Sequence, residues 1–165
     1  MLPWIVDHEA NMDLVFELII AAKVGTAFAL GAFIGYDRER HGHSAGIRTY
    51  AAVSMGAALY ALIALHLEDP AGPTYIIAHI SVGIGFLGAG MIFRDASSQT
   101  AHGLTTAASV WCTAAVGVAV GVNMFVIAGV ATLALYLLLA MERWKWYIAW
   151  KKRIQSTDKG ANGDR

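Results

Sequence analysis

The acidic residues that could bind a cation follow two of the long apolar runs in this sequence. Asp37 and Glu39 come directly after the first run, and Asp95 comes after the third. Hydroxyl side chains begin the second and fourth runs, at Thr49, Thr105 and Thr106. Carboxylate, hydroxyl and carbonyl oxygens are the ligands that a hard cation such as Mg²⁺ prefers. The sequence therefore offers Asp37, Glu39 and Asp95 as candidate metal ligands.

Arginines interleaved with these acids favour a different interpretation. Arg38 and Arg40 alternate with Asp37 and Glu39, and Arg48 lies at the start of the second run. Guanidinium groups bind carboxylates strongly and would compete with a metal for them. A structural network of ion pairs at the helix ends explains the same residues, and the sequence favours it over the metal site.

Lys23 is the one charged residue well inside an apolar run. An ionisable group within a membrane segment is a functional candidate by default. Lys23 lies close to the outer end of its run, however, so its amine could reach the interface. It could also pair with a polar residue near the same end, such as Glu17, His66 or Glu68. We expect a lysine that reaches the interface or pairs, in preference to a transport residue.

The remaining reactive residue types give weak signals. His41 and His43 flank one glycine, a pattern common in solvated loops, so a metal site there is a weak prediction. His79 and Cys112 lie within apolar runs, where we expect a hydrogen-bonded packing histidine and a buried small residue. The sequence has no Ser/His/Asp grouping, no phosphate loop beside a strand and no zinc-ligand spacing. We therefore expect neither an enzyme nor a resident cofactor, and Mg²⁺ is the one ion that the acidic residues suggest.

The elements that must position these residues are apolar runs long enough to cross a membrane. Apolar residues make up 57% of the chain and charged residues 15%, whereas soluble domains average about 45–50% and about 25%. A helix needs about 20 mostly apolar residues to cross the hydrocarbon. The sequence therefore predicts an all-α, polytopic membrane protein with five transmembrane helices, at Leu18–Tyr36, Thr49–Leu67, Thr74–Phe93, Leu104–Gly121 and Asn123–Met141. A tight turn at Gly121–Asn123 separates the last two helices.

The positive charges orient these helices. Arg38, Arg40 and Arg48 lie between the first two runs, Arg94 lies between the third and fourth, and a further group follows the fifth. The N-terminal segment and the other two connections contain no lysine or arginine. Cytoplasmic loops retain positive residues. We therefore predict an N-terminus outside and a C-terminus inside.

Three segments flank the predicted membrane region, which is 18–141. Residues 1–17 form an extracytoplasmic arm. Residues 142–154 mix tryptophans with lysines and arginines, as interfacial helices do, and extend the fifth span along the membrane surface; a partner-binding helix is the alternative. Residues 155–165 are polar, and we expect them to be disordered. The net charge of zero gives no sign of nucleic-acid binding.

A weak internal repeat relates the first two runs to the third and fourth. Without a gap, Leu30–Ala32 aligns with Leu87–Ala89, and Gly46 aligns with Gly103 in the same register. Both copies comprise the end of one span, a cytoplasmic loop and the start of the next span. We predict two parallel helical hairpins related by a pseudo-twofold axis along the membrane normal.

Two blocks of sequence resemble the hallmark motifs of the MgtC/SapB family. GAFIGYDRERHGHSAGIRTYAAVSMGAAL (31–59) resembles its G-x-x-I-G-x-E-R-E and A-G-x-R-T patterns. SVGIGFLGAGMIFRDASSQTAHGLTTAASVWCTAAVGVAVG (81–121) resembles G-I-G-F-L-G-A-G followed by G-L-T-T-A-A. Asp37 stands where the family usually has Glu, and Lys23 where many members have Arg. The resemblance covers about residues 23–140 and implies a multi-pass protein of the bacterial inner membrane.

The glycines of these blocks have two interpretations. Close helix packing is the favoured one, for Gly83 and for the small-xxx-small pairs Gly31/Gly35 and Gly117/Gly121. The other is that glycines of the third run free backbone carbonyls near the inner face for an ion or substrate. The motif residues that we single out for a function are Lys23, Arg38, Arg40, Gly46, Arg48, Thr49, Gly85, Gly88, Gly90, Gly103, Thr105 and Thr106.

The resemblance implies an accessory or regulatory membrane protein in magnesium or acid-stress homeostasis. Such a protein would act through contacts with another membrane protein or with a second copy of itself, as a homodimer. The alternative is a divalent-cation transporter or channel with an acidic cytoplasmic mouth. No Asp or Glu lies in mid-membrane, where Mg²⁺ on a dehydrated path would need one, and this favours the accessory role. Because the chain ends soon after the fifth run, we also expect it to lack the folded cytoplasmic C-terminal domain of some members.

Overall fold

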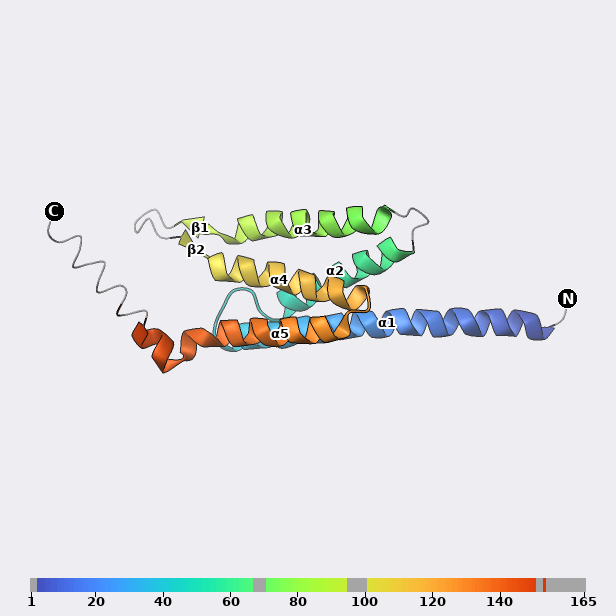
Figure 1. Cartoon of the computed structure of the whole chain (residues 1–165), viewed down its shortest axis with the longest axis horizontal. Coiled ribbons are helices and arrows are strands. Elements are labelled where there is room, and N and C mark those ends of the chain that lie inside the picture. Colours follow the sequence, from blue (N-terminus) through green and yellow to red (C-terminus); the bar gives the residue numbers. More distant parts are fainter. Residues whose placement is uncertain (1–2, 67–70, 95–100, 151–152, 154–165) are drawn as a thin grey trace.

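The structure, a computed structural model, describes residues 3–66, 71–94, 101–150 and 153 of the chain. The described residues form five long helices, which are α1 (Pro3–Arg40), α2 (Ile47–Leu65), α3 (Gly72–Met91), α4 (Leu104–Gly121) and α5 (Phe125–Ala140) (Figure 1). Each is long and apolar enough to cross a membrane. The prediction of an all-α protein with five membrane-spanning helices is therefore confirmed.

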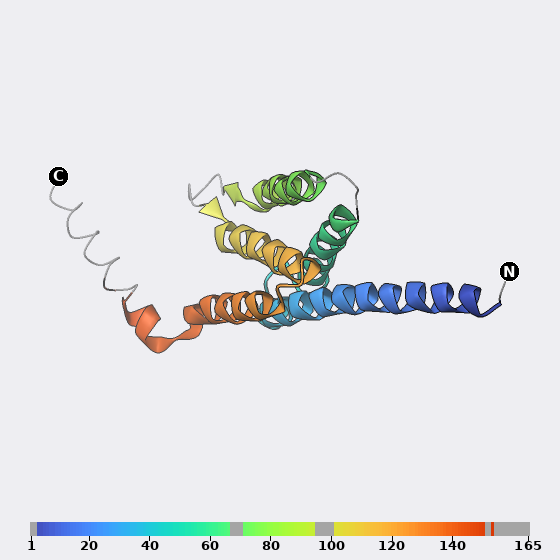
Figure 2. The same cartoon turned by 45° about the vertical axis from the view of Figure 1, so that its right-hand side comes forward.

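The first helix begins well before the predicted start at Leu18. Between Pro3 and Gly25 the sequence contains neither glycine nor a further proline, and proline is favoured at the first position of a helix. Nothing in this stretch interrupts the helix, so residues predicted as an N-terminal arm continue α1 outwards from the membrane region. The N-terminal part of α1 extends beyond the other helices (Figures 1 and 2).

The connections at the two ends of the bundle depend on residues that tolerate a left-handed backbone. Gly42 follows α1 at a φ of 74°, a conformation that glycine adopts without steric cost. Asn123 lies between α4 and α5 at a φ of 66°, which asparagine tolerates better than most residues. The predicted tight turn between the last two helices is confirmed.

Two short strands, which the sequence did not predict, join α3 to α4. β1 (Phe93–Arg94) pairs antiparallel with β2 (Ala101–His102), so that Phe93 lies opposite His102. Phe93, predicted to end the third span, therefore belongs to a hairpin and not to a helix. The candidate ligand Asp95 falls in 95–100, outside the described residues.

The segment after α5 does not continue that helix. A 3-10 turn, η1 (Met141–Arg143), is followed by Trp144 in an extended conformation, and residues 145–150 are again helical. The predicted basic and aromatic segment at 142–154 therefore starts with a bend, which Figure 1 shows at the end of α5. The predicted tail at 155–165 lies outside the described residues.

Helices α2 and α4 form the centre of the bundle. α2 packs against α1, α3 and α4, and α4 packs against all the other helices, whereas α3 lies on the side away from α1 and α5 (Figures 1 and 2). The buried residues follow this arrangement, since α3 buries only Gly72 and Gly88 whereas α2 and α4 each bury eight or more residues. Large apolar side chains such as Phe86 are exposed on the outside, as lipid-facing surfaces require. The orientation across the membrane and the two-hairpin repeat stay predictions.

Candidate functional site: a polar cluster at the end of the bundle

Four consecutive charged residues end α1, and helical geometry sends each of them in a different direction. Successive residues of an α-helix are about 100° apart around its axis. Asp37 contacts the turn after α5, Arg38 contacts α4, and Glu39 contacts the start of α2. Arg40 is exposed. We call the three residues that make contacts, together with their side-chain partners, the polar cluster; its members are Asp37, Arg38, Glu39, His41, Thr106 and Arg143.

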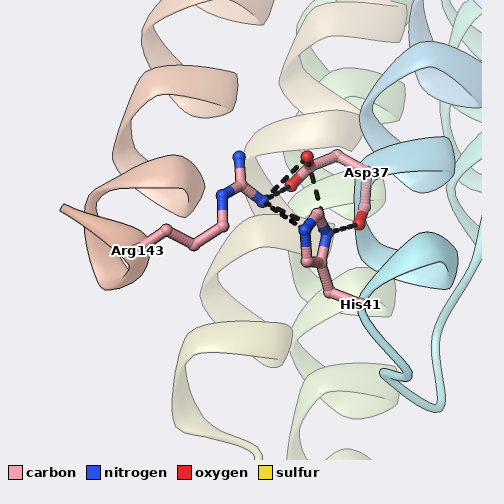
Figure 3. Close-up of polar contacts among 3 residues, drawn as sticks. All are labelled: Asp37, His41 and Arg143. Carbon is pink, nitrogen blue, oxygen red and sulfur yellow. Dashed lines mark hydrogen bonds and ion pairs between the residues drawn. The ribbon is translucent and has the colours of Figure 1, made fainter.

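Asp37 is bonded to Arg143 (Figure 3). Nη1 of Arg143 donates to both carboxylate oxygens, at 2.9 and 3.0 Å. Asp37 is only 8% exposed, and burial strengthens a charged hydrogen bond that water would otherwise weaken. This contact fastens the end of α1 to the segment that follows α5.

His41 completes this contact one helical turn after Asp37. Its Nδ1 lies 2.6 Å from the main-chain oxygen of Asp37, so Nδ1 must carry the proton that this carbonyl accepts. Nη1 of Arg143 lies 3.1 Å from Nδ1 and 3.2 Å from Nε2 of the same ring. His41 therefore contacts both the main chain of Asp37 and the guanidinium that binds the Asp37 carboxylate.

Arg38 is the most deeply buried charge of the polar cluster, at 3% exposure. Its Nη2 donates to Oγ1 of Thr106, in the first turn of α4, at 3.0 Å. Its Nε is buried and has no hydrogen-bond partner in the described part of the chain. Arg38 also forms no ion pair with a described carboxylate, since the ion pairs found there involve Asp37 with His41 and with Arg143.

Glu39 stabilises the start of α2. Its Oε2 accepts a hydrogen bond of 2.9 Å from the main-chain N–H of Ile47, the first residue of that helix. A carboxylate is favourable at a helix N-terminus because of the free N–H groups and the helix dipole. Gly46 makes room for this contact, because a Cβ there would lie 3.0 Å from the Cβ of Glu39 and closer still to its carboxylate.

Hydroxyl groups extend the polar cluster into the bundle. Oγ of Ser109 donates to the main-chain oxygen of Thr106 at 2.9 Å and lies 2.5 Å from the hydroxyl of Tyr50. Because the Ser109 proton is used for Thr106, Tyr50 must donate to Ser109. Thr113 is bonded to the main chain of Ser109, and the buried Oγ of Ser54 has no partner among the described residues. Among the described residues of α2 and α4, four buried side chains therefore carry hydroxyl groups, Tyr50, Ser54, Ser109 and Thr113, and the other buried side chains are apolar.

The charge of Arg38 also reaches His43 in the loop after α1. Burial lowers the pKa of His43 below its ordinary value of 6.5, and the positive charge of Arg38 lowers it further. The main-chain N–H of His43 donates to the main-chain oxygen of Arg38 at 3.1 Å. His43 is therefore a reporter of the electrostatic potential around Arg38.

The predicted metal ligands do not form a common site within the described residues. Asp37 is bonded to Arg143 and Glu39 to Ile47, on different sides of α1. No group of three or more His, Cys, Asp or Glu side chains that could hold a metal is present among the described residues. Because Asp95 lies outside them, the three-residue metal site stays a prediction.

The other candidates are scattered. Lys23 is half-buried and has no hydrogen bond or ion pair with a described residue; its suggested partner Glu68 lies outside them. Arg48 and Thr105 are exposed, and Thr49 is half-buried. His79 bonds to the main-chain oxygen of Tyr75 at 2.7 Å, but on an exposed face.

Cys112 is exposed on α4, so the prediction that it is a buried small residue is wrong. Apolar neighbours in sequence do not place a residue inside a membrane bundle, because the outer faces of the helices are apolar as well.

The glycines divide into two groups. Gly31, Gly35, Gly117 and Gly121 lie where α1 and α4 approach α2 and its preceding residue; a Cβ at Gly31 would come within 2.5 Å of the main-chain oxygen of Tyr50. Gly88 is in ordinary contact distance of Ala107. Gly103, at a φ of 87°, leaves no room for a side chain beside the main-chain oxygen of Met91. Three other glycines of α3, Gly83, Gly85 and Gly90, have no described atom within 4 Å of an added Cβ.

The predicted site residues did not include Arg143 or the hydroxyl residues of this region, which are Tyr50, Ser54, Ser109 and Thr113. Arg143 is the first basic residue after the fifth apolar run, so its predicted depth matches that of Asp37. This shared depth is the sequence feature that could have identified Arg143 as a partner of Asp37. Tyr50 and Ser109 carry no comparable signal, since single polar residues in apolar runs also occur on lipid-facing surfaces.

Comparison with known proteins supports one family. The sequence model of the MgtC family matches residues 24–145. Protein MgtC of Brucella abortus is 41% identical over 123 residues, which are 74% of this chain and 51% of that protein. Protein MgtC of Salmonella typhimurium is 44% identical over 107 residues, 65% of this chain and 45% of that protein.

A relative of similar length is protein SrpB of Synechococcus elongatus, 31% identical over 170 residues, which are 89% of this chain and 90% of that protein. The chain spans about half the length of the MgtC relatives that it matches. No solved protein structure matches it. With a family match over most of its length and five helices able to cross a membrane, the chain belongs to the MgtC family of bacterial multi-pass membrane proteins.

Proposed function

We propose that this protein is a non-enzymatic accessory or regulator in Mg²⁺ homeostasis that acts through contacts with membrane proteins. The observation that carries this proposal is the state of its buried carboxylate. Both oxygens of Asp37 accept hydrogen bonds from Arg143, so a cation at Asp37 would have to displace a guanidinium. The other nearby acid, Glu39, is engaged at the start of α2.

The interior of the bundle also argues against a path for a dehydrated cation. Arg38, the residue after Asp37, has a buried guanidinium, and its positive charge repels cations. The buried hydroxyls of Tyr50, Ser109 and Thr113 are neutral, so they cannot compensate the charge of a Mg²⁺ ion that has lost its hydration shell. These features support a role in which the helices bind partners and not ions.

The partner would be a second copy of this chain or another membrane protein. α3 is the helix that fits this role best, because its outer face combines exposed side chains such as Phe86 with the open glycines Gly83, Gly85 and Gly90. Small residues let two membrane helices approach closely. A homodimer through α3 is the simplest arrangement of this kind.

A divalent-cation transporter is the second candidate. The observation that favours it is the set of buried hydroxyls between α2 and α4, which includes the Ser54 Oγ that has no partner among the described residues. Such groups could line a hydrated path in an oligomer.

Mg²⁺ entry into liposomes separates the two candidates. The purified protein is reconstituted with an internal Mg²⁺-sensitive dye, and wild type, Asp37→Ala and protein-free vesicles are compared, with an ionophore as the positive control. We expect wild-type entry no faster than in protein-free vesicles. Saturable entry in the wild type that disappears in a folded Asp37→Ala protein would establish transport and overturn the proposal.

A further inference from the structure

Two positively polarised groups meet at the start of α4. The first N–H groups of a helix have no partner within the helix, and the helix dipole gives that end a partial positive charge. Among the described residues, no side chain caps the start of α4. The guanidinium of Arg38 nevertheless lies there, bonded to Thr106 in the first turn. Without an anion, this arrangement is electrostatically unfavourable.

The burial of Arg38 sharpens the problem. At 3% exposure, its charge is largely removed from water, and an ion buried without a partner is costly. One hydrogen bond to a neutral hydroxyl does not neutralise it, and Nε has no partner among the described residues. Within the described part of the chain, the site therefore has an unused N–H donor on Arg38 and no carboxylate ion-paired with this arginine.

At the start of α2, by contrast, a carboxylate binds the N-terminus of the helix. There the carboxylate of Glu39 accepts the N–H of Ile47. The start of α4 corresponds to the start of α2 in the predicted repeat. There the described residues provide no carboxylate, and the guanidinium of Arg38 bonds to Thr106 instead. The start of α4 therefore differs from that of α2 in having no anion among the described residues.

We infer that Arg38, Thr106 and the free N–H groups at the start of α4 bind a phosphate group. A phosphate offers several acceptor oxygens to a guanidinium, a hydroxyl and a helix N-terminus together. In the predicted orientation this end of the bundle meets the cytoplasmic headgroup layer, where lipid phosphates lie. The source is therefore either a lipid headgroup or inorganic phosphate, and both have the same recognition chemistry.

This inference does not depend on the proposed accessory role, because a transporter could hold a structural phosphate equally well. Its test accordingly measures binding and not Mg²⁺ flux. The two can fail separately.

His43 provides the readout. Since the charge of Arg38 lowers the pKa of His43, an anion bound at Arg38 must raise that pKa again. The protein is purified in phosphate-free maltoside micelles, and the imidazole resonances are titrated with pH by NMR. The His43 signal is assigned with a His43→Gln variant. Titrations are repeated in chloride alone, with inorganic phosphate and with a short-chain phosphatidylglycerol.

We expect an anion to raise the pKa of His43 in the wild type and in the matched control Arg40→Gln, which removes an exposed arginine. In Arg38→Gln the anion should cause no further change. Thr106→Val keeps the charge and should weaken the apparent affinity about tenfold, the loss typical of one hydrogen bond to a charged group.

A response to inorganic phosphate would identify a free-anion site, and a response to the lipid alone a headgroup site. The inference is overturned if neither anion moves the pKa of His43. It is also overturned if the response in Arg38→Gln equals that in Arg40→Gln, since that result would show nonspecific screening. Should Arg38→Gln not fold, Thr106→Val decides: an unchanged affinity would remove α4 from the site.

Discussion

At the scale of single residues, Asp37 connects the two ends of the chain's membrane region. Arg143 lies 106 positions later in the sequence, yet it donates to both oxygens of the carboxylate. The contact is only partly shielded, because the Asp37 side chain is 10% exposed and that of Arg143 is 36% exposed. We therefore attribute to it a moderate stabilisation and not the large one of a fully buried ion pair.

Replacing Arg143 should lower the stability of the protein, because Asp37 loses its charged partner. In Arg143→Gln the carboxylate of Asp37 stays buried without its charged donor, and we expect a loss of about 1–2 kcal/mol in stability. The measurement is the midpoint of heat-induced loss of the monodisperse peak in size-exclusion chromatography. Lys145→Gln, which removes an exposed positive charge two residues on, is the matched control. Equal midpoints for the two variants would show that the Asp37 contact does not stabilise the bundle.

Ion pairing was the favoured interpretation for the acids after α1; Asp37 does form an ion pair, with Arg143, whereas Glu39 accepts a main-chain N–H instead. The sequence could not select Arg143 as the partner of Asp37. Several arginines share the same predicted side of the membrane, and charge and depth do not distinguish among them. The selection is made by packing, because α5 returns alongside α1 and its following turn brings Arg143 to the end of α1 (Figure 3).

At the scale of helices, the glycines of α4 and α3 differ in how closely other parts of the protein approach them. Gly117 lies against the main chain of α2 at Ser54, with no room for a Cβ, whereas nothing lies within 4 Å of a Cβ at Gly83. Both are in helix interiors, where alanine is intrinsically favoured over glycine by about 0.5–1 kcal/mol. Any difference between alanine substitutions at the two positions therefore reports packing.

We expect Gly117→Ala to destabilise the protein by about 1–3 kcal/mol, since α4 must move away from α2. In the monomer, Gly83→Ala should leave the stability unchanged or slightly higher, because no described atom lies within 4 Å of the added Cβ. Thermal midpoints of both variants, measured in detergent at a dilution at which the protein is monomeric, check these expectations. A cost at Gly83 in the monomer as large as that at Gly117 would contradict the open environment of α3.

The number of helices could be predicted from sequence because membrane thickness fixes the length of an apolar run. Which face of each helix is buried in the bundle could not be predicted from the sequence. Lipid is as apolar as the interior of the bundle, so the pattern of apolar residues does not distinguish Cys112, which is exposed, from Val110, which is buried. The same ambiguity left both interpretations of the α3 glycines open. The early start of α1 was missed because the sequence prediction marked only the apolar run.

At the scale of the whole molecule, what the polar cluster can bind depends on the side of the membrane that it faces. The short connections bearing arginine predict that the loop after α1 is cytoplasmic and that the turn between α4 and α5 is outside. Ser44 in the loop and Asn123 in the turn are both exposed. Each is a suitable position for a single cysteine.

Labelling of these two cysteines with a membrane-impermeant maleimide tests the orientation. In a Cys112→Ala background, Asn123→Cys should react in intact spheroplasts, and Ser44→Cys should react only after permeabilisation. Cys112 is itself exposed, so its removal is needed for a clean background. The reverse pattern would place the polar cluster outside the cell. There it would face no cytoplasmic leaflet, and Arg38 would draw any lipid phosphate from the outer leaflet instead.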